Sequence, residues 1–208
     1  MTLTLYGAAR SRASIVRWYL EEKGIPYASV LLDLRNGEQR HEPFTTINPF
    51  GKVPALIDDA FSGPDGEALK LFESGAILLY LAEHYGGEFQ SDGPAGDEAA
   101  AARRALTAQW ILFANASFGP AMLQSASRPE ELQRLLATLE GVLAKGEHLL
   151  AGSWGDPGWG AADCAMQAYL AYLPLFCADL DLTPYPRVQA LIAATAARPA
   201  YAKVMGAA

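Results

Sequence analysis

The sequence predicts two regions of different fold class: a small three-layer α/β unit over about the first 85 residues, and an all-helical region from residue 97 onward. In the first third, the spacing of apolar residues switches repeatedly between the two-residue period of strands and the 3.6-residue period of helices. Beyond residue 97 only the helical spacing remains. The chain has 208 residues, of which 51% are hydrophobic and 19% charged, so it can build an ordered core.

The first elements read as strand, helix and strand. Leu3 and Leu5 alternate with threonines, which is typical of a strand. Residues 11–23 carry apolar side chains at helical spacing, and Gly24 supplies the stop. Residues 27–32 return to strand character. This β-α-β order indicates an α/β layer structure.

The rest of the first region continues the alternation. An irregular polar stretch, 33–48, includes a predicted short helix at 43–47. Two strands follow, at 53–58 and 69–72, joined by a Gly-Pro-Asp-Gly loop. Residues 74–85 read as a helix with its apolar side chains on one face.

Residues 86–96 contain four glycines, one proline and few apolar residues, so they predict a linker. The sequence therefore predicts domains at 1–85 and 97–208, separated by that linker. The second domain is predicted to contain four helices and a short tail, the helices at 97–118, 129–150, 160–178 and 185–197.

Charge and hydropathy exclude several function classes. The formal net charge of −7 argues against a nucleic-acid binder, which needs a basic face. No window approaches the roughly 18 apolar residues of a membrane span, and the N-terminus lacks the pattern of a signal peptide. We therefore expect a cytoplasmic protein. Arg10, Arg12 and Arg17 precede the first acidic residue, Glu21. They indicate either a small anionic ligand or three solvated side chains.

The cysteines and histidines do not form a metal-binding pattern. Cys164 and Cys177 lie thirteen residues apart, and the three histidines are scattered along the chain. We expect neither a bound metal nor a disulfide framework. Both cysteines are expected to pack as small apolar side chains.

Three segments carry a family resemblance. Residues 48–56 read Asn-Pro-Phe-Gly-Lys-Val-Pro-Ala-Leu, residues 72–81 read Phe-Glu-Ser-Gly-Ala-Ile-Leu-Leu-Tyr-Leu, and both follow a strand that ends in Leu-Tyr-Gly. Over essentially its whole length the chain resembles a cytosolic glutathione transferase. The opening Tyr-Gly-x-x-x-Ser suggests a serine-type class, bacterial chi-like or theta-like. The resemblance implies a thioredoxin-like domain that binds glutathione, a helical domain that holds the electrophile, a role in detoxification and a homodimer.

The resemblance places the reactive step at Ser11. A free thiol has a pKa near 8.5, so the protein must stabilise the glutathione thiolate. The Ser11 hydroxyl can donate a hydrogen bond to sulfur, assisted by the helix N-terminus. Arg10 and Arg12 offer a full positive charge to the same anion. The sequence leaves open which of these groups is the main stabiliser, and Ser11 can also simply cap the helix.

Four further residues are expected to bind the tripeptide. By resemblance, the Val53–Pro54 bond is cis, and the Val53 backbone pairs with the cysteinyl backbone of glutathione. Glu73 and Ser74 match the ammonium and carboxylate of the γ-glutamyl end, because a helix N-terminus also attracts an anion. The alternative reading of Ser74 is a plain N-cap.

The glycine carboxylate of glutathione needs a cation or hydrogen-bond donor. The family pattern assigns this role to Gln39, Arg40 and Lys52. The chain departs from a common version of the pattern, in which a histidine stands in place of Gln39. The alternative is that all three are solvated loop residues without a binding role.

The helical domain offers candidates for an apolar electrophile pocket, although core packing is an alternative role for aromatic side chains at helical spacing. The candidates are Trp110, Phe113, Phe118, Met122, Phe176 and Tyr201. Residues 160–163, Gly-Ala-Ala-Asp, resemble the family's helix-capping segment, with Gly160 where a Ser or Thr is usual.

Other functions on the same fold stay open. The first region has no cysteine, which argues against mixed-disulfide chemistry of the glutaredoxin type. The remaining alternatives are a non-catalytic module that binds glutathione or another protein, and a glutathione-dependent dehalogenase, isomerase or peroxidase.

Overall fold

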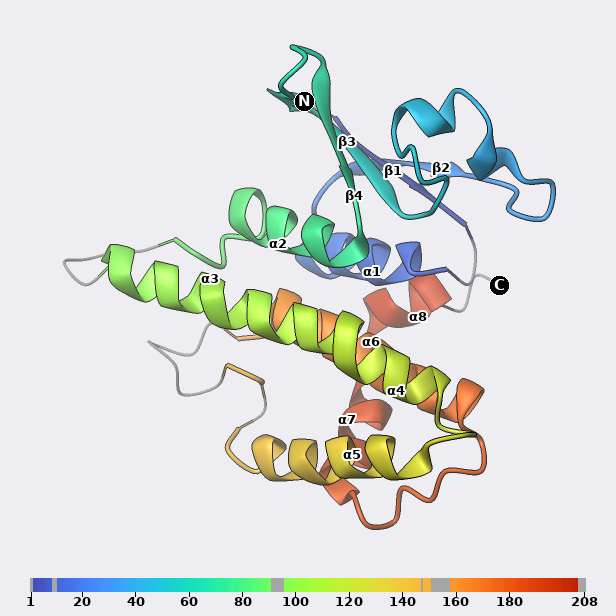
Figure 1. The fold of residues 1–208 in the computed structure, drawn as a ribbon. Helices are drawn as coiled ribbons and strands as arrows, with labels where there is room; N and C mark the ends of the chain where they lie inside the picture. Colours follow the sequence, from blue (N-terminus) through green and yellow to red (C-terminus); the bar gives the residue numbers. More distant parts are fainter. Residues whose placement is uncertain (1, 9–10, 91–95, 147, 151–157, 206–208) are drawn as a thin grey trace. The chain divides into compact units, whose positions relative to one another are not determined.

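The fold is known from a computed structural model that describes residues 2–8, 11–90, 96–146, 148–150 and 158–205 (Figure 1). The chain forms two compact units. The first comprises residues 1–81 together with 199–208, and the second comprises 82–198. The first unit has the thioredoxin-like α/β architecture that the sequence predicts, and the second is helical.

A mixed four-stranded sheet organises the first unit. Its strands lie in the order β2-β1-β3-β4, with β1 and β2 parallel and the other two pairs antiparallel. The strands are β1 Leu3–Gly7, β2 Tyr27–Leu31, β3 Ala55–Ser62 and β4 Ala68–Phe72. Leu3 and Leu5 are buried, as their alternation with threonine predicts.

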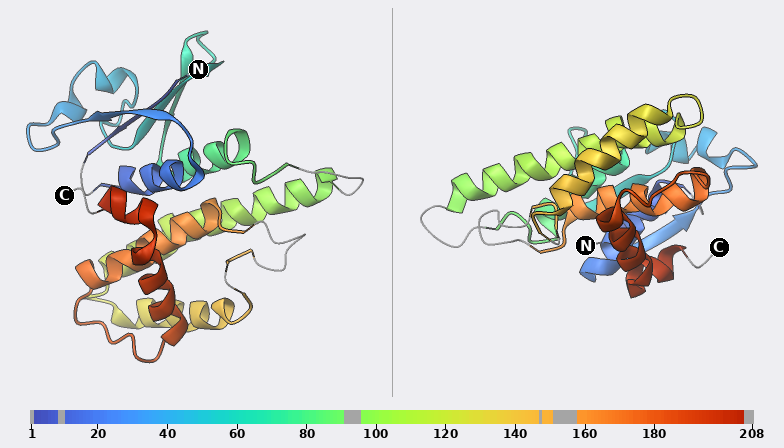
Figure 2. Two further views of the ribbon diagram at one scale, coloured as in Figure 1. Left: turned by 180° about the vertical axis from the view of Figure 1, so that it is seen from behind. Right: turned by 90° about the horizontal axis from the view of Figure 1, so that it is seen from below.

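Helices α1 (Ala13–Lys23) and α2 (Ser74–His84) cover one face of this sheet (Figures 1 and 2). The buried side of α1 includes Trp18 and Tyr19, which are fully buried. On the other face, two short 3₁₀ turns, η1 (Glu38–Arg40) and η2 (Phe44–Thr46), form the third layer. Their core is a cluster of Phe44, Ile47 and Ala55, against which Tyr6, Leu32, Val53 and Ile57 pack.

The last helix differs from the prediction. Residues 97–208 were expected to form one helical domain, but α8 (Pro199–Met205) belongs to the first unit. Its Tyr201 ring meets the Trp18 ring edge-on at 5.0 Å, and Lys203 Nζ lies 2.6 Å from Glu21 Oε2. A helix of seven residues is stable only when it packs, and the apolar face made by Tyr201 and Val204 packs on α1.

The second unit is built around a buried helix, α6, whose residues 161–170 are all buried. The elements of this unit are α3 Gly96–Phe113, η3 Ala114–Phe118, α4 Gly119–Leu123, α5 Pro129–Leu143, α6 Ala161–Phe176 and α7 Pro186–Ala197. The prediction of a helix over 129–150 was too long, because α5 ends at Leu143 and is followed by a turn at Ala144 and Lys145. No helix among the described residues is long and apolar enough to cross a membrane.

Candidate functional site

The strand register brings the three motif segments to one edge of the sheet. Tyr6 pairs with Ala55, and Ala55 pairs with Phe72. The end of β1, the start of β3 and the end of β4 therefore lie side by side. The residues that flank these strand ends, Val53–Pro54 before β3 and Glu73–Ser74 after β4, are thus neighbours of the loop that follows Gly7. Antiparallel pairing therefore brings together segments that lie far apart in the sequence.

The polar loop after β2 starts from the same edge. The Leu32 N–H donates to the Gly7 carbonyl at 2.8 Å. Further along, Gly51 has a φ of 60°, and a Cβ on it would lie 2.8 Å from the carbonyl oxygen of Gln39. Only glycine allows this close approach. It holds Lys52 next to Gln39 and Arg40, so the three predicted carboxylate-binding residues come together.

Asn48 fixes this arrangement, and it was not among the predicted site residues. Its side chain is buried, with an exposed fraction of 2%. Its Nδ2 donates to the Lys52 carbonyl at 2.6 Å, and its Oδ1 accepts the Phe50 N–H at 3.1 Å. Both bonds close the turn that precedes Val53. A polar residue at the head of the Asn-Pro-Phe-Gly motif was the available signal, because such side chains hold turns.

The Ser11 hydroxyl lies just before α1 and is already hydrogen-bonded. It donates to the Ala8 carbonyl at 2.8 Å and accepts the Ala13 N–H at 3.2 Å and the Ala8 N–H at 3.4 Å. The side chain therefore satisfies one of the first N–H groups of α1, as a cap does. To donate to a thiolate, the hydroxyl must turn away from the Ala8 carbonyl.

Of the two arginines proposed beside the thiolate, Arg12 is described and Arg10 lies outside the described residues. Arg12 is exposed and immediately precedes α1. The first turn of α1 carries no acidic side chain, so its N-terminus stays electropositive. Gly7 permits the approach of this helix, because a Cβ there would overlap the side chain of Ala13.

Glu73 is the cap of α2, in place of the predicted Ser74. Among the described residues it is the single non-glycine residue with a positive φ, 69°. Its carbonyl accepts the Ile77 N–H at 3.0 Å, which closes the first turn. Ser74 is the first helical residue and is buried, whereas the Glu73 side chain is exposed. A left-handed glutamate costs roughly 1–2 kcal/mol, and such strain clusters at functional sites.

The remaining tripeptide-binding candidates lie in η1 and in the turn before β3, and their role in binding stays a prediction. The Val53–Pro54 bond is cis. Lys52 and Arg40 are exposed. Gln39 is half-buried, and its Oε1 is buried without a hydrogen-bond partner among the described residues. A buried polar atom without a partner is costly, so a ligand that supplies one is favoured.

The apolar candidates do not form one cluster. Trp110 and Phe113 meet edge-on at 5.7 Å and line a groove of about 290 Å³ with the side chains of α5. Phe118 and Met122 are buried in the core of the second unit. Phe176 is 61% exposed at the end of α6, and Tyr201 belongs to the first unit. Their role in binding an electrophile stays a prediction.

The chain is similar to known proteins over most of its length. Residues 1–83 match the N-terminal domain of the glutathione S-transferases. Glutathione S-transferase F10 of Arabidopsis thaliana is 32% identical over 195 residues, which cover 84% of this chain and 79% of that protein. The disulfide-bond oxidoreductase YfcG of Escherichia coli is 35% identical over 123 residues, 59% of this chain and 53% of that protein.

A solved structure is also similar to this chain in sequence and fold. The glutathione transferase of Burkholderia graminis, crystallised with two glutathione molecules bound per subunit, is 32% identical. It superposes with a TM-score of 0.78 and covers 99% of this chain and 88% of its own. The fold agrees with these similarities. The position of the three motif segments at one edge of the sheet agrees with them as well. The chain belongs to the glutathione S-transferase family.

Proposed function

We propose that this protein is a serine-type glutathione transferase, chi-like or theta-like, that joins the thiolate of glutathione to small apolar electrophiles. The observation that carries the proposal is the left-handed cap Glu73. It lies beside Ser74 at the sheet edge where the Ser11 loop and Val53 also meet. The Glu73 side chain is exposed there, so its carboxylate is free to meet the ammonium of an amino-acid ligand, and strained backbone of this kind clusters at ligand sites.

Two groups of side chains would hold the ends of the tripeptide. At the γ-glutamyl end, the Glu73 carboxylate pairs with the ammonium, and Ser74 with the α2 N-terminus receives the carboxylate. At the glycine end, Lys52 and Arg40 supply positive charge, and the Nε2 group of Gln39 can donate a hydrogen bond to the carboxylate. The cysteinyl part then lies between them, against the backbone of Val53 and near Ser11.

Ser11 acts on the thiol of the cysteinyl part, which lies between the two ends of the bound tripeptide. The thiol proton leaves to solvent, and the Ser11 hydroxyl turns from the Ala8 carbonyl to donate to the thiolate. The N-terminus of α1 and the neighbouring arginines add positive potential. The sulfur lone pair then forms the carbon–sulfur bond, and with an aryl halide the halide departs with the bonding pair. Apolar surfaces such as the Trp110–Phe113 pair suit a carbon-rich electrophile.

A second candidate is the reduction of disulfides by two glutathione molecules. It is favoured by the similarity to YfcG and by the two glutathione molecules of the Burkholderia structure. The first region of this chain has no cysteine, so both electrons would come from glutathione, which leaves as its disulfide. Ser11 would stabilise the attacking thiolate in the same way.

We further propose a cytoplasmic homodimer. Phe50, at the tip of the turn that Asn48 closes, is 70% exposed. A single large aromatic side chain held so far out by an ordered turn suits a contact with a second copy. Sedimentation of the wild type and of Phe50→Ser tests this. A dimer that dissociates in the variant is expected, and a wild-type monomer would overturn it.

One substrate panel tests the function. The wild type and Ser11→Ala are assayed with an aryl halide, an isothiocyanate, a peroxide and a small disulfide, each with glutathione. Turnover of the first two that falls in Ser11→Ala supports the transferase. Turnover confined to the disulfide supports the second candidate. Retention on immobilised glutathione without turnover of any substrate would support a binding module.

A further inference from the structure

Asn36 is followed by Gly37 in the turn between β2 and η1 (Figure 1). An asparagine before a glycine is chemically labile, because the glycine nitrogen can attack the side-chain amide carbon and no side chain on the glycine hinders it. Asn36 is exposed. Apart from the chain neighbours of Gly37, no heavy atom of the described residues lies within 4 Å of the position that a Cβ on it would take. Solvent therefore reaches the amide and the space beside the glycine.

Among the described residues, two hydrogen bonds hold the reacting groups. Asn36 Nδ2 donates to Asp33 Oδ2 at 2.8 Å, and the Gly37 N–H donates to the Leu34 carbonyl at 3.3 Å. The second bond is long, so the nitrogen that must attack is held weakly. Both bonds lie within one exposed turn of the chain. Local opening of this turn therefore releases the amide and the nitrogen together.

The other two asparagines of the chain are protected from the same reaction. Asn48 precedes Pro49, whose nitrogen carries no hydrogen and cannot attack. The Asn115 side chain is held at both ends, because its Nδ2 donates to the Ile111 carbonyl at 2.9 Å and its Oδ1 accepts the Tyr169 hydroxyl at 3.0 Å. Asn36 is therefore the labile position, and Asn115 is its internal control.

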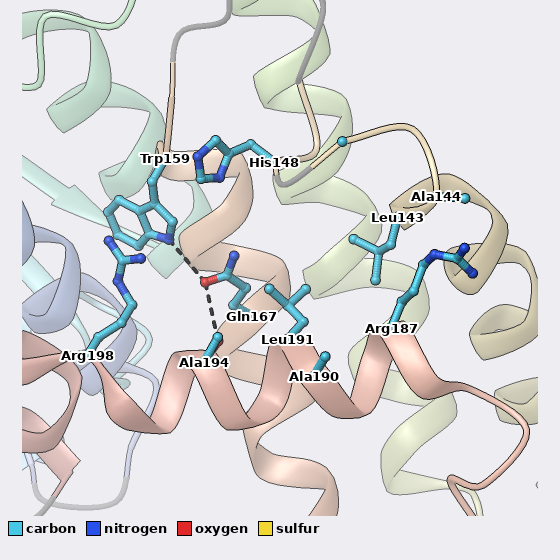
Figure 3. A pocket seen from close by; sticks show the side chains of 12 residues that line it. Leu143, Ala144, His148, Trp159, Gln167, Arg187, Ala190, Leu191, Ala194 and Arg198 are labelled. Atoms are coloured by element: carbon cyan, nitrogen blue, oxygen red, sulfur yellow. Dashed lines mark hydrogen bonds between the residues drawn. The ribbon is translucent and has the colours of Figure 1, made fainter.

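Figure 3 shows how a buried side-chain amide is immobilised in this chain. Gln167 Oε1 accepts the Trp159 indole N–H at 3.0 Å and the Thr195 hydroxyl at 3.3 Å. These two donors come from different segments of the second unit, Trp159 before α6 and Thr195 on α7. The Asn36 amide, in contrast, bonds to Asp33, three positions away in its own turn. It lacks the links between segments that would prevent the attack.

We propose that Asn36 is a deamidation site, and that its conversion weakens the binding of glutathione at Gln39 and Arg40. The second part rests on the proposed function. The Gly37 N–H gives its proton to a solvent base, and the nitrogen forms a bond to Asn36 Cγ. The bond from Cγ to the amide nitrogen breaks, and that nitrogen takes a proton from water and leaves as ammonia. Water then opens the cyclic imide on either side of the glycine nitrogen, which gives aspartate or isoaspartate.

Either product places a carboxylate where the amide donor was. Asn36 Nδ2 lies 2.8 Å from Asp33 Oδ2, so the new carboxylate replaces a donor with a negative charge beside an existing one. The Glu38 carboxylate is a third, because its Oε2 accepts the Asp33 N–H at 2.6 Å. Asp33 shapes the turn by accepting the Arg35 N–H at 2.9 Å. Repulsion among these carboxylates therefore loosens the turn that precedes η1.

The turn is directly connected to the residues expected at the glycine end of the tripeptide. The Gly37 carbonyl accepts the Arg40 N–H at 2.8 Å and so closes η1. Isoaspartate adds one carbon atom to the backbone before Gly37, which moves this carbonyl. Gln39 and Arg40 lie in η1 and move with it. The added negative charge also repels the glycine carboxylate of glutathione. Deamidation therefore produces a slow, one-way loss of affinity.

Peptide mass mapping of the full-length protein, incubated at neutral and at mildly alkaline pH, tests the modification. The mass difference between an amide and an acid identifies conversion, and chromatography separates isoaspartate from aspartate. A synthetic peptide of residues 31–42 gives the rate without the fold. Asn36→Gln is the blocked variant, because its longer side chain would have to form a less favourable ring. We expect acid to accumulate at Asn36, faster at the alkaline pH, and none at Asn115. Asn36 that stays an amide in the folded protein while the synthetic peptide converts would overturn the assignment.

Calorimetry with glutathione tests the consequence. Asn36→Asp and the incubated wild type should bind about twofold or more weakly than the fresh wild type, whereas Asn36→Gln should keep its affinity through the incubation. Gln133→Glu adds the same charge at an exposed position on α5 and should bind like the wild type. Conversion at Asn36 without loss of affinity would overturn the link to η1. A fresh wild type that does not bind glutathione would overturn the proposed function and this consequence, while the mass map still decides the modification.

Discussion

The carboxylate of Glu88 accepts the backbone N–H of Ala161 with both oxygens, at 3.0 and 3.1 Å, although the two residues lie 73 positions apart. Gly160, at the cap position of α6, has no side chain that could do this. A Cβ on Gly160 would lie 2.6 Å from Glu88 Oε2, so the glutamate occupies the place of the missing side chain. The buried Asp163 completes the cap by accepting the Gly160 N–H at 3.2 Å and the Leu149 N–H at 3.0 Å.

This relationship predicts a compensating pair of substitutions. Glu88→Ala leaves the Ala161 N–H without its partner and should lower the free energy of unfolding by about 0.5–2 kcal/mol. Gly160→Ser alone should also destabilise, because its Cβ meets the Glu88 carboxylate. In the double variant the serine hydroxyl can cap α6 itself, so stability should recover toward the wild type. Urea unfolding of the wild type, the two single variants and the double variant measures the coupling free energy between the two positions. Strictly additive losses of unfolding free energy would contradict the compensation.

A second glutamate caps α7 and makes stability depend on pH. Burial alone would raise the pKa of Glu140, but it accepts the N–H groups of Arg187 and Val188 and pairs with the Arg187 guanidinium. The net result is a pKa below the ordinary value of 4.5. The folded state therefore holds this proton less tightly than the unfolded state. The stabilisation is present above pH 4.5 and is lost as pH falls through the lowered pKa.

Glu140→Gln should remove that part of the pH dependence. The wild type and the variant are compared by urea unfolding from pH 7 down to about pH 3.5. The difference in unfolding free energy between them should shrink on acidification, since a protonated Glu140 resembles glutamine. Asp179→Asn, which neutralises an exposed carboxylate in the α6–α7 connection, serves as the control. A wild-type-to-variant difference that is constant over this range would rule out the cap.

Ser11→Ala should raise the pKa of the bound glutathione thiol by about one unit. A hydrogen bond to a charged group contributes about 1.5–3 kcal/mol, and the Ser11 hydroxyl gives up its bond to Ala8 to make it. Ultraviolet titration of the thiolate in the glutathione complex measures this shift. Arg12→Ala is titrated beside it. A larger shift in Arg12→Ala would make the arginine the main stabiliser, and an unmoved pKa in Ser11→Ala would remove Ser11 from the mechanism.

Glu73→Gly tests whether the Glu73 side chain binds glutathione in addition to its role at the cap of α2. Glycine adopts a φ of 69° without strain, so the variant should unfold no more easily than the wild type. Loss of the carboxylate should weaken glutathione binding about tenfold or more, because the ligand ammonium loses its charged partner. Calorimetry measures the affinity, with Glu67→Gln on the same hairpin as control. Unchanged affinity in Glu73→Gly would leave the residue with a capping role alone.

Much of the fold and of the candidate site follows from local patterns in the sequence. The alternation of Leu3 and Leu5 defines a strand, and the Asn-Pro-Phe-Gly-Lys-Val-Pro segment marks the turn that Asn48 and Gly51 then shape. These features depend on neighbours in sequence. The site residues were predicted by the family resemblance, and the pairing of β1, β3 and β4 that brings their segments together is not specified by the local alternation.

Other features depend on partners that no local pattern reveals. The α6 cap is supplied by Glu88, which lies in a segment predicted as a linker. The lack of a capping side chain at Gly160 does not indicate which other residue supplies the cap. The residues of α8 were predicted as a short tail, and no local pattern indicated that Tyr201 packs on Trp18. Residue type indicated Ser74 as the cap of α2, whereas Glu73 holds the cap position, with a φ of 69° and its carbonyl bonded to the Ile77 N–H.

The return of α8 to the first unit has a consequence for biosynthesis. Trp18 is fully buried, and part of its cover is Tyr201, which leaves the ribosome after residues 82–198 of the helical unit. The glutathione-binding unit is therefore completed only after the helical unit has been synthesised, although its strands come first. Until then, nascent chains expose an indole surface to chaperones. For the same reason, residues 1–85 cut out as a separate domain would lack part of their own core.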